Sequence, residues 1–119
     1  MPHPTDIKLR TQSKLLTICF DDGSRYDLPF EYLRVYSPSA EVRGHGPGQE
    51  TLQLGKHTVG IKGVEPAGQY AIRIVFDDGH DSGLYTWGYL QELGQTHTEK
   101  WQHYLDRLKD LGIPYPTPV

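Results

Sequence analysis

Two copies of one acidic tetrapeptide are the first residues in this chain that could do chemistry. The sequence Phe-Asp-Asp-Gly occurs at residues 20–23 and again at residues 76–79. Paired carboxylates can act as general acid and base, but only when they face each other across a substrate. Asp-Gly also adopts the positive φ angles of tight strand reversals, and each copy follows an alternating apolar run. We therefore predict that both copies are hairpin turns.

Six histidines raise the question of a metal site: His3, His45, His57, His80, His97 and His103. Glu99 and His103 are four residues apart, so a helix would place them on one face, but zinc needs three or four protein ligands. His97 and Glu99 have the His-x-acid spacing of non-haem iron oxygenases, whose site also requires a distant second histidine. We favour a surface salt contact between Glu99 and His103 over either metal site.

A glycine-rich loop between the two turns is the best candidate for a contact surface. Residues 37–48 are dense in serine, proline and glycine, and they include Arg43, Gly44, His45 and Gly46. Such a segment can form a nest of backbone N–H groups beside two basic side chains, which suits an anion. The alternative is a flexible loop in which glycine only supplies backbone angles. The chain contains no phosphate loop, dinucleotide fingerprint or nucleophile elbow, so we do not expect an autonomous enzyme.

The elements that must position these residues repeat along the chain. Residues 15–20 and 25–28 alternate around the first turn, and residues 70–76 and 84–85 surround the second. A short apolar helix is expected after each hairpin, at residues 30–33 and 87–90. We predict a degenerate duplicated unit of hairpin and helix. Its local signals are Pro29 in the first helical turn, Thr86 as an N-cap and Gly94 as a helix end.

Further elements complete the expected domain. Strands are predicted at residues 51–54 and 59–64, the second ending before Pro66. The clearest helix lies near the carboxyl end, where Thr96 and Glu99 have the spacing of a capping box and Gly112 supplies a stop. Its apolar stripe consists of Trp101, Tyr104, Leu105, Leu108 and Leu111. We predict an α+β fold, a small single domain of antiparallel β-hairpins with short helices and a C-terminal amphipathic helix.

Size and charge restrict the class of function. The 119 residues suffice for one domain, and the formal net charge of −3 with scattered basic residues is atypical of a nucleic-acid binder. No run approaches the ~20 apolar residues of a membrane span, and the amino terminus does not resemble a signal peptide. The single cysteine, Cys19, excludes an internal disulfide. We expect a cytoplasmic protein.

Several stretches, in order, resemble one protein family. They are LPFEYLR at residues 28–34, SPSAEVRGHG at 37–46, VEPAGQYA at 64–71 and FDDGHDSGLY at 76–85. Together they resemble the gamma-butyrobetaine hydroxylase-like N-terminal domain, found in bacteria as a stand-alone domain of unknown function. The resemblance covers residues 7–94. We assign residues 95–112 to a C-terminal helix packed on this domain and residues 113–119 to an extended Pro-rich tail.

The resemblance also implies where a metal would lie. In the carnitine-pathway oxygenases that carry this domain, three cysteines and one histidine hold a structural zinc. The cysteine positions fall on Ser37, Ser39 and Val42, and the histidine falls on His80. Serine hydroxyls are poor zinc ligands and one imidazole cannot hold the ion, so we expect no metal cofactor in this arrangement. The alternative is a different zinc or iron site in which His45 joins His80.

Our functional prediction is a stand-alone, non-catalytic binding module. Its expected contact is the 37–48 loop with Arg43 and His45, acting on a partner protein and on neither nucleic acid nor membrane. The alternative is a zinc- or iron-binding accessory protein linked to iron–sulfur cluster assembly. The resemblance suggests a P-loop ATPase of cluster assembly or an oxygenase as partner. A third option is a small enzyme that uses His80 and Asp81 as acid and base.

Overall fold

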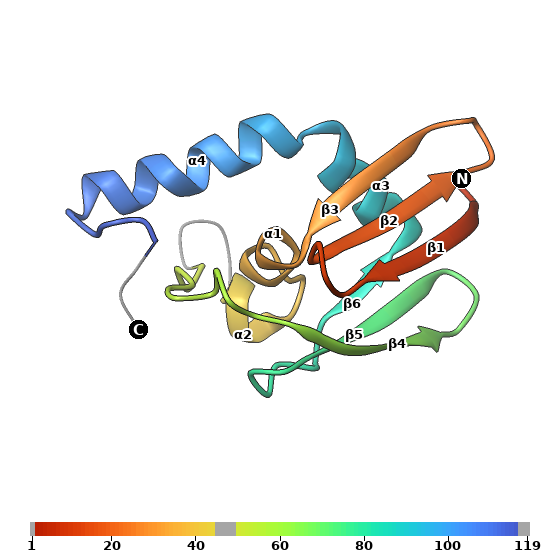
Figure 1. Ribbon diagram of the computed structural model, residues 1–119, viewed down its shortest axis with the longest axis horizontal. Helices are drawn as coiled ribbons and strands as arrows, with labels where there is room; N and C mark the ends of the chain where they lie inside the picture. Colours follow the sequence, from red (N-terminus) through yellow and green to blue (C-terminus); the bar gives the residue numbers. More distant parts are fainter. Residues whose placement is uncertain (1, 45–49, 117–119) are drawn as a thin grey trace.

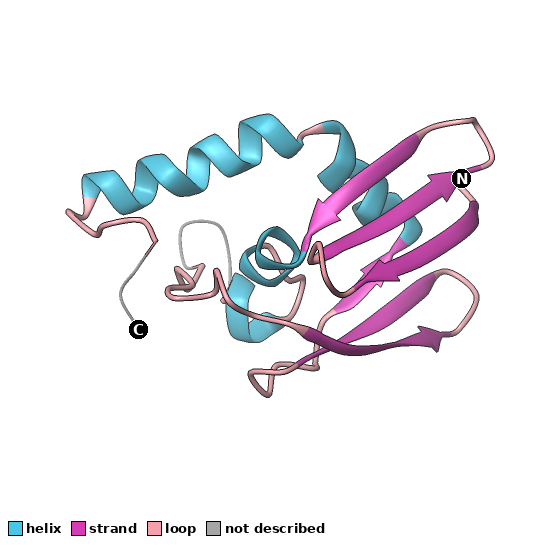
Figure 2. Ribbon diagram, viewed as in Figure 1, coloured by secondary structure: helices cyan, strands magenta, loops and turns pink. Residues whose placement is uncertain are grey.

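The computed structural model describes residues 2–44 and 50–116 of the chain and has an α+β fold, as predicted (Figures 1 and 2). The strands are β1 (Pro4–Arg10), β2 (Leu15–Phe20), β3 (Arg25–Pro29), β4 (Ile61–Ala67), β5 (Ala71–Phe76) and β6 (Leu84–Thr86). The helices are α1 (Phe30–Val35), α2 (Ala40–Arg43), α3 (Trp87–Gln95) and α4 (His97–Asp110). No helix in these two ranges is long and apolar enough to span a membrane.

The strands form two antiparallel sheets with the same plan. One sheet has the order β1-β2-β3 and the other β4-β5-β6, and each last strand leads directly into a helix, α1 or α3. Both Asp-Asp-Gly sequences are hairpin turns, with Gly23 at φ 87° and Gly79 at φ 91°. Glycine meets this requirement because it has no Cβ to clash in the left-handed region. The predicted duplication is therefore real, and its unit has three strands instead of two.

The third strand of each unit is where the sequence predictions need correction. Strand β1 was not predicted, because it is an edge strand whose alternating Ile7 and Leu9 are only half-buried. Strand β4 begins later than expected and runs through Pro66, which pairs with Ile72. An edge strand tolerates proline because it forms a hydrogen-bonded ladder on one side only. The strand predicted at residues 51–54 is absent, since the Thr51 N–H donates to the Val42 carbonyl of α2 instead.

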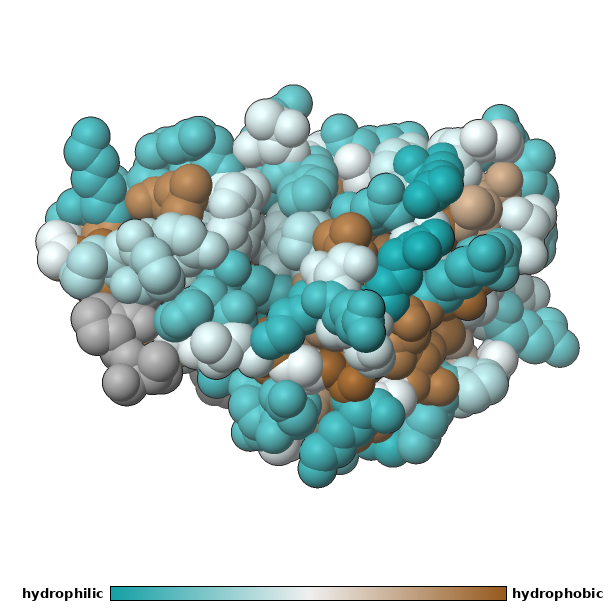
Figure 3. All heavy atoms as spheres, viewed as in Figure 1, coloured by the Kyte–Doolittle hydropathy of each residue, from teal (hydrophilic) through white to brown (hydrophobic). Residues whose placement is uncertain are grey.

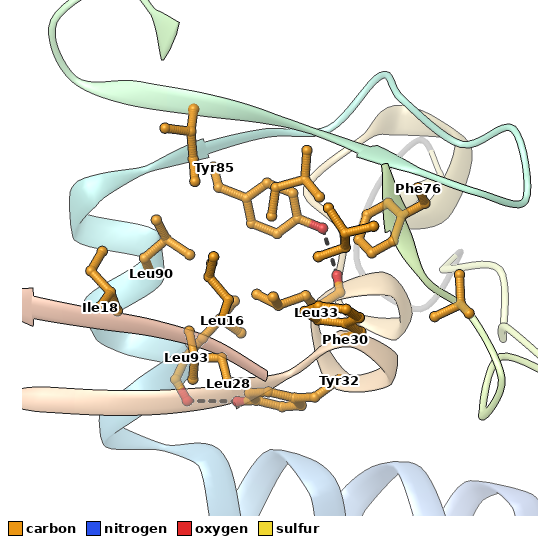
Figure 4. Close-up of a cluster of buried hydrophobic side chains, with 14 of the residues drawn as sticks. Leu16, Ile18, Leu28, Phe30, Tyr32, Leu33, Phe76, Tyr85, Leu90 and Leu93 are labelled. Atoms are coloured by element: carbon orange, nitrogen blue, oxygen red, sulfur yellow. Dashed lines mark hydrogen bonds between the residues drawn. The ribbon is translucent and has the colours of Figure 1, made fainter. Parts of the chain in front are cut away.

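One hydrophobic core joins the two units (Figure 4). Strands β2 and β5 are its centre, and both helices that follow the sheets cover it. The core side chains include Leu16, Ile18, Phe20, Leu28, Phe30, Leu33, Ile72, Ile74, Phe76, Leu90 and Leu93. Burial of this many large apolar groups removes their surface from water, which is the dominant favourable term in folding. Hydrophilic residues cover most of the molecular face seen in Figure 3.

Two tyrosines at equivalent positions tie the units together. Tyr32 is the third residue of α1, and its hydroxyl donates to the Leu93 carbonyl in the last turn of α3 at 2.7 Å (Figure 4). Tyr89 is the third residue of α3, and its hydroxyl donates to the Tyr36 carbonyl just after α1 at 2.5 Å. Each helix thus satisfies an unpaired carbonyl at the end of the other, a group that a helix cannot satisfy internally.

The helix ends confirm some local predictions and correct others. Thr86 caps α3 by accepting from the Tyr89 N–H at 3.1 Å, as predicted. Gly94 does not end α3 but lies inside it, and glycine is required there because a Cβ would clash with the Tyr26 ring. The capping box is wrong, since the Thr96 hydroxyl donates back to the Glu92 carbonyl. Pro29 is the extended residue before α1 and lies outside its first turn.

The C-terminal helix α4 is amphipathic, although its apolar stripe is shorter than predicted. Tyr104 and Leu108 are buried, while Leu111 lies beyond the helix and is exposed. Gly112 has φ 69°, and the Ile113 N–H donates to the Leu108 carbonyl at 2.9 Å, which closes the helix end. Tyr115 folds back so that its hydroxyl donates to Glu31 at 2.7 Å.

Candidate functional site

The second hairpin turn holds an ion-pair network. The Asp78 carboxylate accepts from Arg34 Nε of α1 at 2.9 Å and from Lys56 Nζ at 2.8 Å. Arg34 is only 7% exposed, and its guanidinium also donates to Gln53 at 2.9 Å. Partial burial opposes ionisation of Asp78, but hydrogen bonds from Lys56, the His80 N–H and Arg34 outweigh it and lower its pKa to about 2. At neutral pH the Asp78 carboxylate is therefore charged, and it neutralises the buried Arg34 guanidinium.

His80, in the same turn, connects the second unit to α2. Its Nε2 lies 2.8 Å from Ser37 Oγ and its Nδ1 lies 3.0 Å from Glu41 Oε2. The residue is 5% exposed, and burial, followed by the nearby charge of Arg34, lowers the pKa of its imidazole. We call Ser37, Glu41 and His80 the His80 cluster. At neutral pH its imidazole is uncharged, with one nitrogen donating and the other accepting.

The His80 cluster has the order of groups found in serine hydrolases, but not their access. Ser37 is 1% exposed, and its Oγ also accepts from the Ser39 N–H at 3.2 Å. A Cβ added at Gly83 would lie 2.5 Å from this oxygen, so the second hairpin closes directly over it. A nucleophile needs space for the substrate carbon it attacks. The cluster therefore acts as a hydrogen-bonded connection, buried at Ser37 and His80 and exposed at Glu41, that fixes α2 against the second hairpin.

The same residues show how well a metal would fit. The structure brings Ser37, Ser39 and His80 together, and Ser39 Oγ lies 2.7 Å from Ser82 Oγ. Val42, on α2, is buried and offers no donor atom. The Ser37 hydroxyl already bonds to the imidazole and the Ser39 hydroxyl to that of Ser82, and hydroxyl oxygen is a poor zinc ligand. Within residues 2–44 and 50–116, no three His, Cys, Asp or Glu side chains are grouped to hold an ion. This donor set does not fit zinc or iron.

A cavity of about 830 Å³ lies on the other side of Ser37, and we call it the α4 groove. Three tyrosines line it: Tyr36, Tyr89 and Tyr104. Their hydroxyls donate to the backbone carbonyls of Lys100, Tyr36 and Gln53 at 2.6, 2.5 and 2.6 Å. Burial raises the pKa of both Tyr36 and Tyr104 to about 12, so these phenols stay neutral. Tyr36 and Tyr89 are half-buried and contribute aromatic surface to the groove, whereas Tyr104 is buried, and all three hydroxyls are already hydrogen-bonded.

Basic side chains surround this aromatic surface. The Arg43 guanidinium lies 4.8 Å from the Tyr89 ring centre, and the Lys100 amine lies 5.6 Å from that of Tyr36. Lys100 also lies 3.7 Å from the Glu92 carboxylate. Arg107 and His103 line the groove as well, and the side chain of neither makes a hydrogen bond or ion pair with any residue that the structure describes. The groove thus combines positively charged side chains with aromatic rings.

The predicted site residues separate into two places. Ser37 and His80 meet in the His80 cluster with Ser39 beside them, whereas Arg43 faces the groove. His45 lies outside the described residues. Asp81 does not pair with His80 but with Arg73 at 3.2 Å. The predicted salt contact between Glu99 and His103 does not form, since both are exposed on α4 without a bond between them.

Sequence analysis missed most of the groove. Lys100, His103 and Arg107 follow one another at three- and four-residue intervals in α4, which places them on one helical face. The three- and four-residue spacing of these basic residues is the sequence signal that could have predicted this side of the groove. Arg34 and Lys56, the partners of Asp78, had no local signal, because they approach the turn from distant parts of the chain.

The chain is similar to one protein family and to several solved structures. A family model described as gamma-butyrobetaine hydroxylase-like, N-terminal, matches residues 7–91. Two proteins solved by solution NMR are similar over all of this chain. One is 51% identical with a TM-score of 0.84, over 93% of its own length. The other is 42% identical with a TM-score of 0.80, over 89% of its length.

A crystal structure from Acidithiobacillus ferrooxidans is also similar. It is described as a protein with unknown function that belongs to the DUF971 family. It shares 34% identity and a TM-score of 0.65, and the match covers 76% of this chain and 91% of that one. No curated protein matches the chain.

Proposed function

The chain belongs to the gamma-butyrobetaine hydroxylase-like N-terminal family, and from that premise we propose that it is a non-catalytic binding module whose contact surface is the α4 groove. Residues 7–94 form the module in this proposal, and the helix assigned to residues 95–112 completes it. We further propose a cytoplasmic location, which suits a chain with a single cysteine.

The observation that carries this proposal is the composition of the groove. A cavity of about 830 Å³ combines three tyrosine rings with Arg43, Lys100, His103 and Arg107. Tyrosine and arginine are enriched at protein interfaces because each combines a large contact area with directional polar groups. Unlike the His80 cluster, the groove formed by the described residues is large enough to admit side chains of a partner. Recognition by this surface therefore agrees better with the side chains than catalysis does.

The His80 cluster supports the groove in this proposal. Arg43 is the last residue of α2, and Glu41 of the same short helix accepts a hydrogen bond from His80. A helix of one turn has little stability of its own, so tertiary contacts must hold it in place. Ser39 adds to this by capping α2, accepting from the Glu41 N–H at 3.2 Å. The buried cluster thus positions Arg43 at the groove.

The groove proposal is tested by site-specific photo-cross-linking in native cells. A photoreactive amino acid at His103, which is exposed in the groove, is compared with the same residue at Lys62, exposed on β4 outside it. We expect a discrete protein adduct from position 103 and none from position 62. Equal adducts at both positions, or no adduct at position 103, would overturn the proposal. The partners suggested by resemblance, a P-loop ATPase or an oxygenase, are the first adducts to look for.

The alternative function as a zinc- or iron-binding accessory protein has no support from the donor atoms. Elemental analysis of protein purified without added metal separates the two functions. We expect far less than one zinc or iron ion per chain, since hydroxyl and single-imidazole donors bind these ions weakly. A stoichiometric metal that is lost in His80→Ala would establish the alternative.

A further inference from the structure

We propose that the α4 groove binds an acidic, extended peptide segment of a partner protein. This inference rests on the proposed function and specifies the chemistry of the partner. Its basis is a line of basic side chains along one face of α4, formed by Lys100, His103 and Arg107. Lys100 and Arg107 are seven residues apart, a distance of about 10 Å along a helix.

The sign of the charge in the groove is opposite to that of the whole chain. The formal net charge is −3, yet the groove is lined by Arg43, Lys100 and Arg107 against the two carboxylates Glu50 and Glu92. Glu92 is already engaged with Lys100 at 3.7 Å. Arg43 and Arg107 have no carboxylate partner among the described residues. A local positive field on an acidic protein selects a negatively charged ligand by electrostatic complementarity.

The tyrosines define the rest of the ligand. All three hydroxyls donate to backbone carbonyls, so the tyrosines offer a ligand no free donor. Tyr36 and Tyr89 are half-buried and carry Lys100 and Arg43 over their rings, whereas Tyr104 is buried. Carboxylates of the ligand must therefore pair with the basic side chains, while its apolar atoms contact the exposed parts of Tyr36 and Tyr89. Arginine suits this role because its planar guanidinium binds a carboxylate through two parallel hydrogen bonds.

The dimensions favour an extended peptide. A strand rises about 3.3 Å per residue, so the line from Lys100 to Arg107 spans about three residues of extended chain. Side chains of such a segment alternate between its two faces. Acidic residues at alternate positions would then all point toward α4. A nucleic-acid strand is a weaker candidate, because its affinity depends on many phosphate contacts over a broad basic surface.

The test uses the full chain and two fluorescein-labelled octapeptides. One alternates glutamate with tyrosine, and the other replaces every glutamate by glutamine. Fluorescence anisotropy measures the affinity for each at low and at moderate salt. We expect the glutamate peptide to bind about tenfold or more tightly than the glutamine peptide, and its affinity to fall as salt rises. Equal affinity for the two peptides would overturn the inference.

Charge reversal locates the binding surface. Arg107→Glu and Arg43→Glu are each expected to weaken binding of the glutamate peptide by about tenfold or more. Lys109→Glu is the matched control, since Lys109 is in the same last turn of α4 but does not line the groove. The control should bind within about twofold of the unchanged chain. A similar loss in all three variants would contradict the assignment, and thermal melting checks that each remains folded.

The outcomes of the two experiments are separable. Cross-linking at position 103 without binding of the glutamate peptide would leave the groove as the contact surface but refute an acidic partner. Mass spectrometry of the cross-linked fragment gives an independent answer, because the inference requires that fragment to be rich in Asp or Glu. Failure of both cross-linking and peptide binding would remove the proposed function together with this inference.

Discussion

The two Phe-Asp-Asp-Gly turns share a backbone but not a role. In the first, the Phe20 N–H donates to the Ser24 carbonyl at 2.9 Å, and in the second the Phe76 N–H donates to the His80 carbonyl at 3.0 Å. Each second aspartate accepts from the N–H two residues later, Asp22 from Ser24 and Asp78 from His80. The local sequence thus produces the same turn twice.

The surroundings make the difference between them. Asp22 lies in water, where the hydroxyl and N–H of Ser24 lower its pKa. Asp78 instead pairs with Arg34 and Lys56, and His80 takes the place of Ser24 and reaches across to Ser37 and Glu41. A duplicated motif therefore keeps its turn chemistry, while its contacts with the rest of the chain decide what its side chains do.

Replacing the second aspartate of each turn by alanine should give the largest difference in unfolding free energy between the two turns. Asp78→Ala leaves the buried Arg34 guanidinium with Gln53 but without a counter-charge. Loss of one partner of a mostly buried ion pair costs about 3 kcal/mol of unfolding free energy. Asp22→Ala removes hydrogen bonds from Ser24 and from the Gln91 side chain of α3, all of them exposed, and should cost much less. Urea unfolding measures both, and equal losses would show that the two turns are equivalent after all.

Exchanging Ser24 and His80, the residues that differ between the two turns, should have a smaller effect on stability. His80→Ser gives the second turn the residue of the first and leaves the buried Ser37 hydroxyl without its imidazole partner. An unsatisfied buried polar group costs about 2 kcal/mol. The reverse change, Ser24→His, removes only an exposed hydroxyl hydrogen bond to Asp22 at a turn near the surface and should cost less. Thermal melting of the two variants tests this, and a larger loss for Ser24→His would refute it.

The pH dependence of stability should show the smallest effect. Burial and Arg34 lower the pKa of His80, so the folded chain binds a proton there less readily than the unfolded chain does. His80 therefore stabilises the fold above its ordinary pKa of about 6.5, and this stability is lost as the pH falls through the folded value. His97, whose pKa burial also lowers, adds to the same trend.

The variant that separates these two histidines is His80→Ser. We expect its unfolding free energy to fall less steeply between pH 7 and pH 5 than that of the unchanged chain, leaving the share of His97. Asp78 acts at lower pH, since its pKa of about 2 lies below the ordinary value and its contribution is lost only as the pH falls toward 2. An unchanged slope between pH 7 and pH 5 would mean that His80 is not the group that titrates.

Local sequence signals were sufficient to predict most of the turns and helix ends of the fold. The Asp-Gly turns, the Thr86 cap and the helix stop at Gly112 were predictable because their chemistry lies within a few neighbouring residues. Gly94 was wrongly predicted to end a helix. Glycine is required there because the Tyr26 ring of the other unit packs against this position, and no neighbouring residue indicates that contact. Strand β1 was missed because an edge strand buries too little to show a strong alternation.

The candidate site was less predictable for the same reason. Resemblance placed Ser37, Ser39 and His80 at corresponding positions, and the structure brings them together in one cluster. It did not predict Glu41 as the second partner of His80, nor that Arg43 lies over the Tyr89 ring. These contacts join residues about forty positions apart, and no spacing rule in the sequence specifies such distances.

The exchanged tyrosine hydroxyls have a consequence for how the molecule opens. Tyr32 satisfies the end of α3 and Tyr89 satisfies the end of α1, so neither three-stranded unit can separate without exposing a carbonyl in the other. Amide hydrogen exchange in β2 and in β5 should therefore report one shared opening free energy, that of global unfolding. The two repeats would behave as a single cooperative unit in spite of their separate sheets.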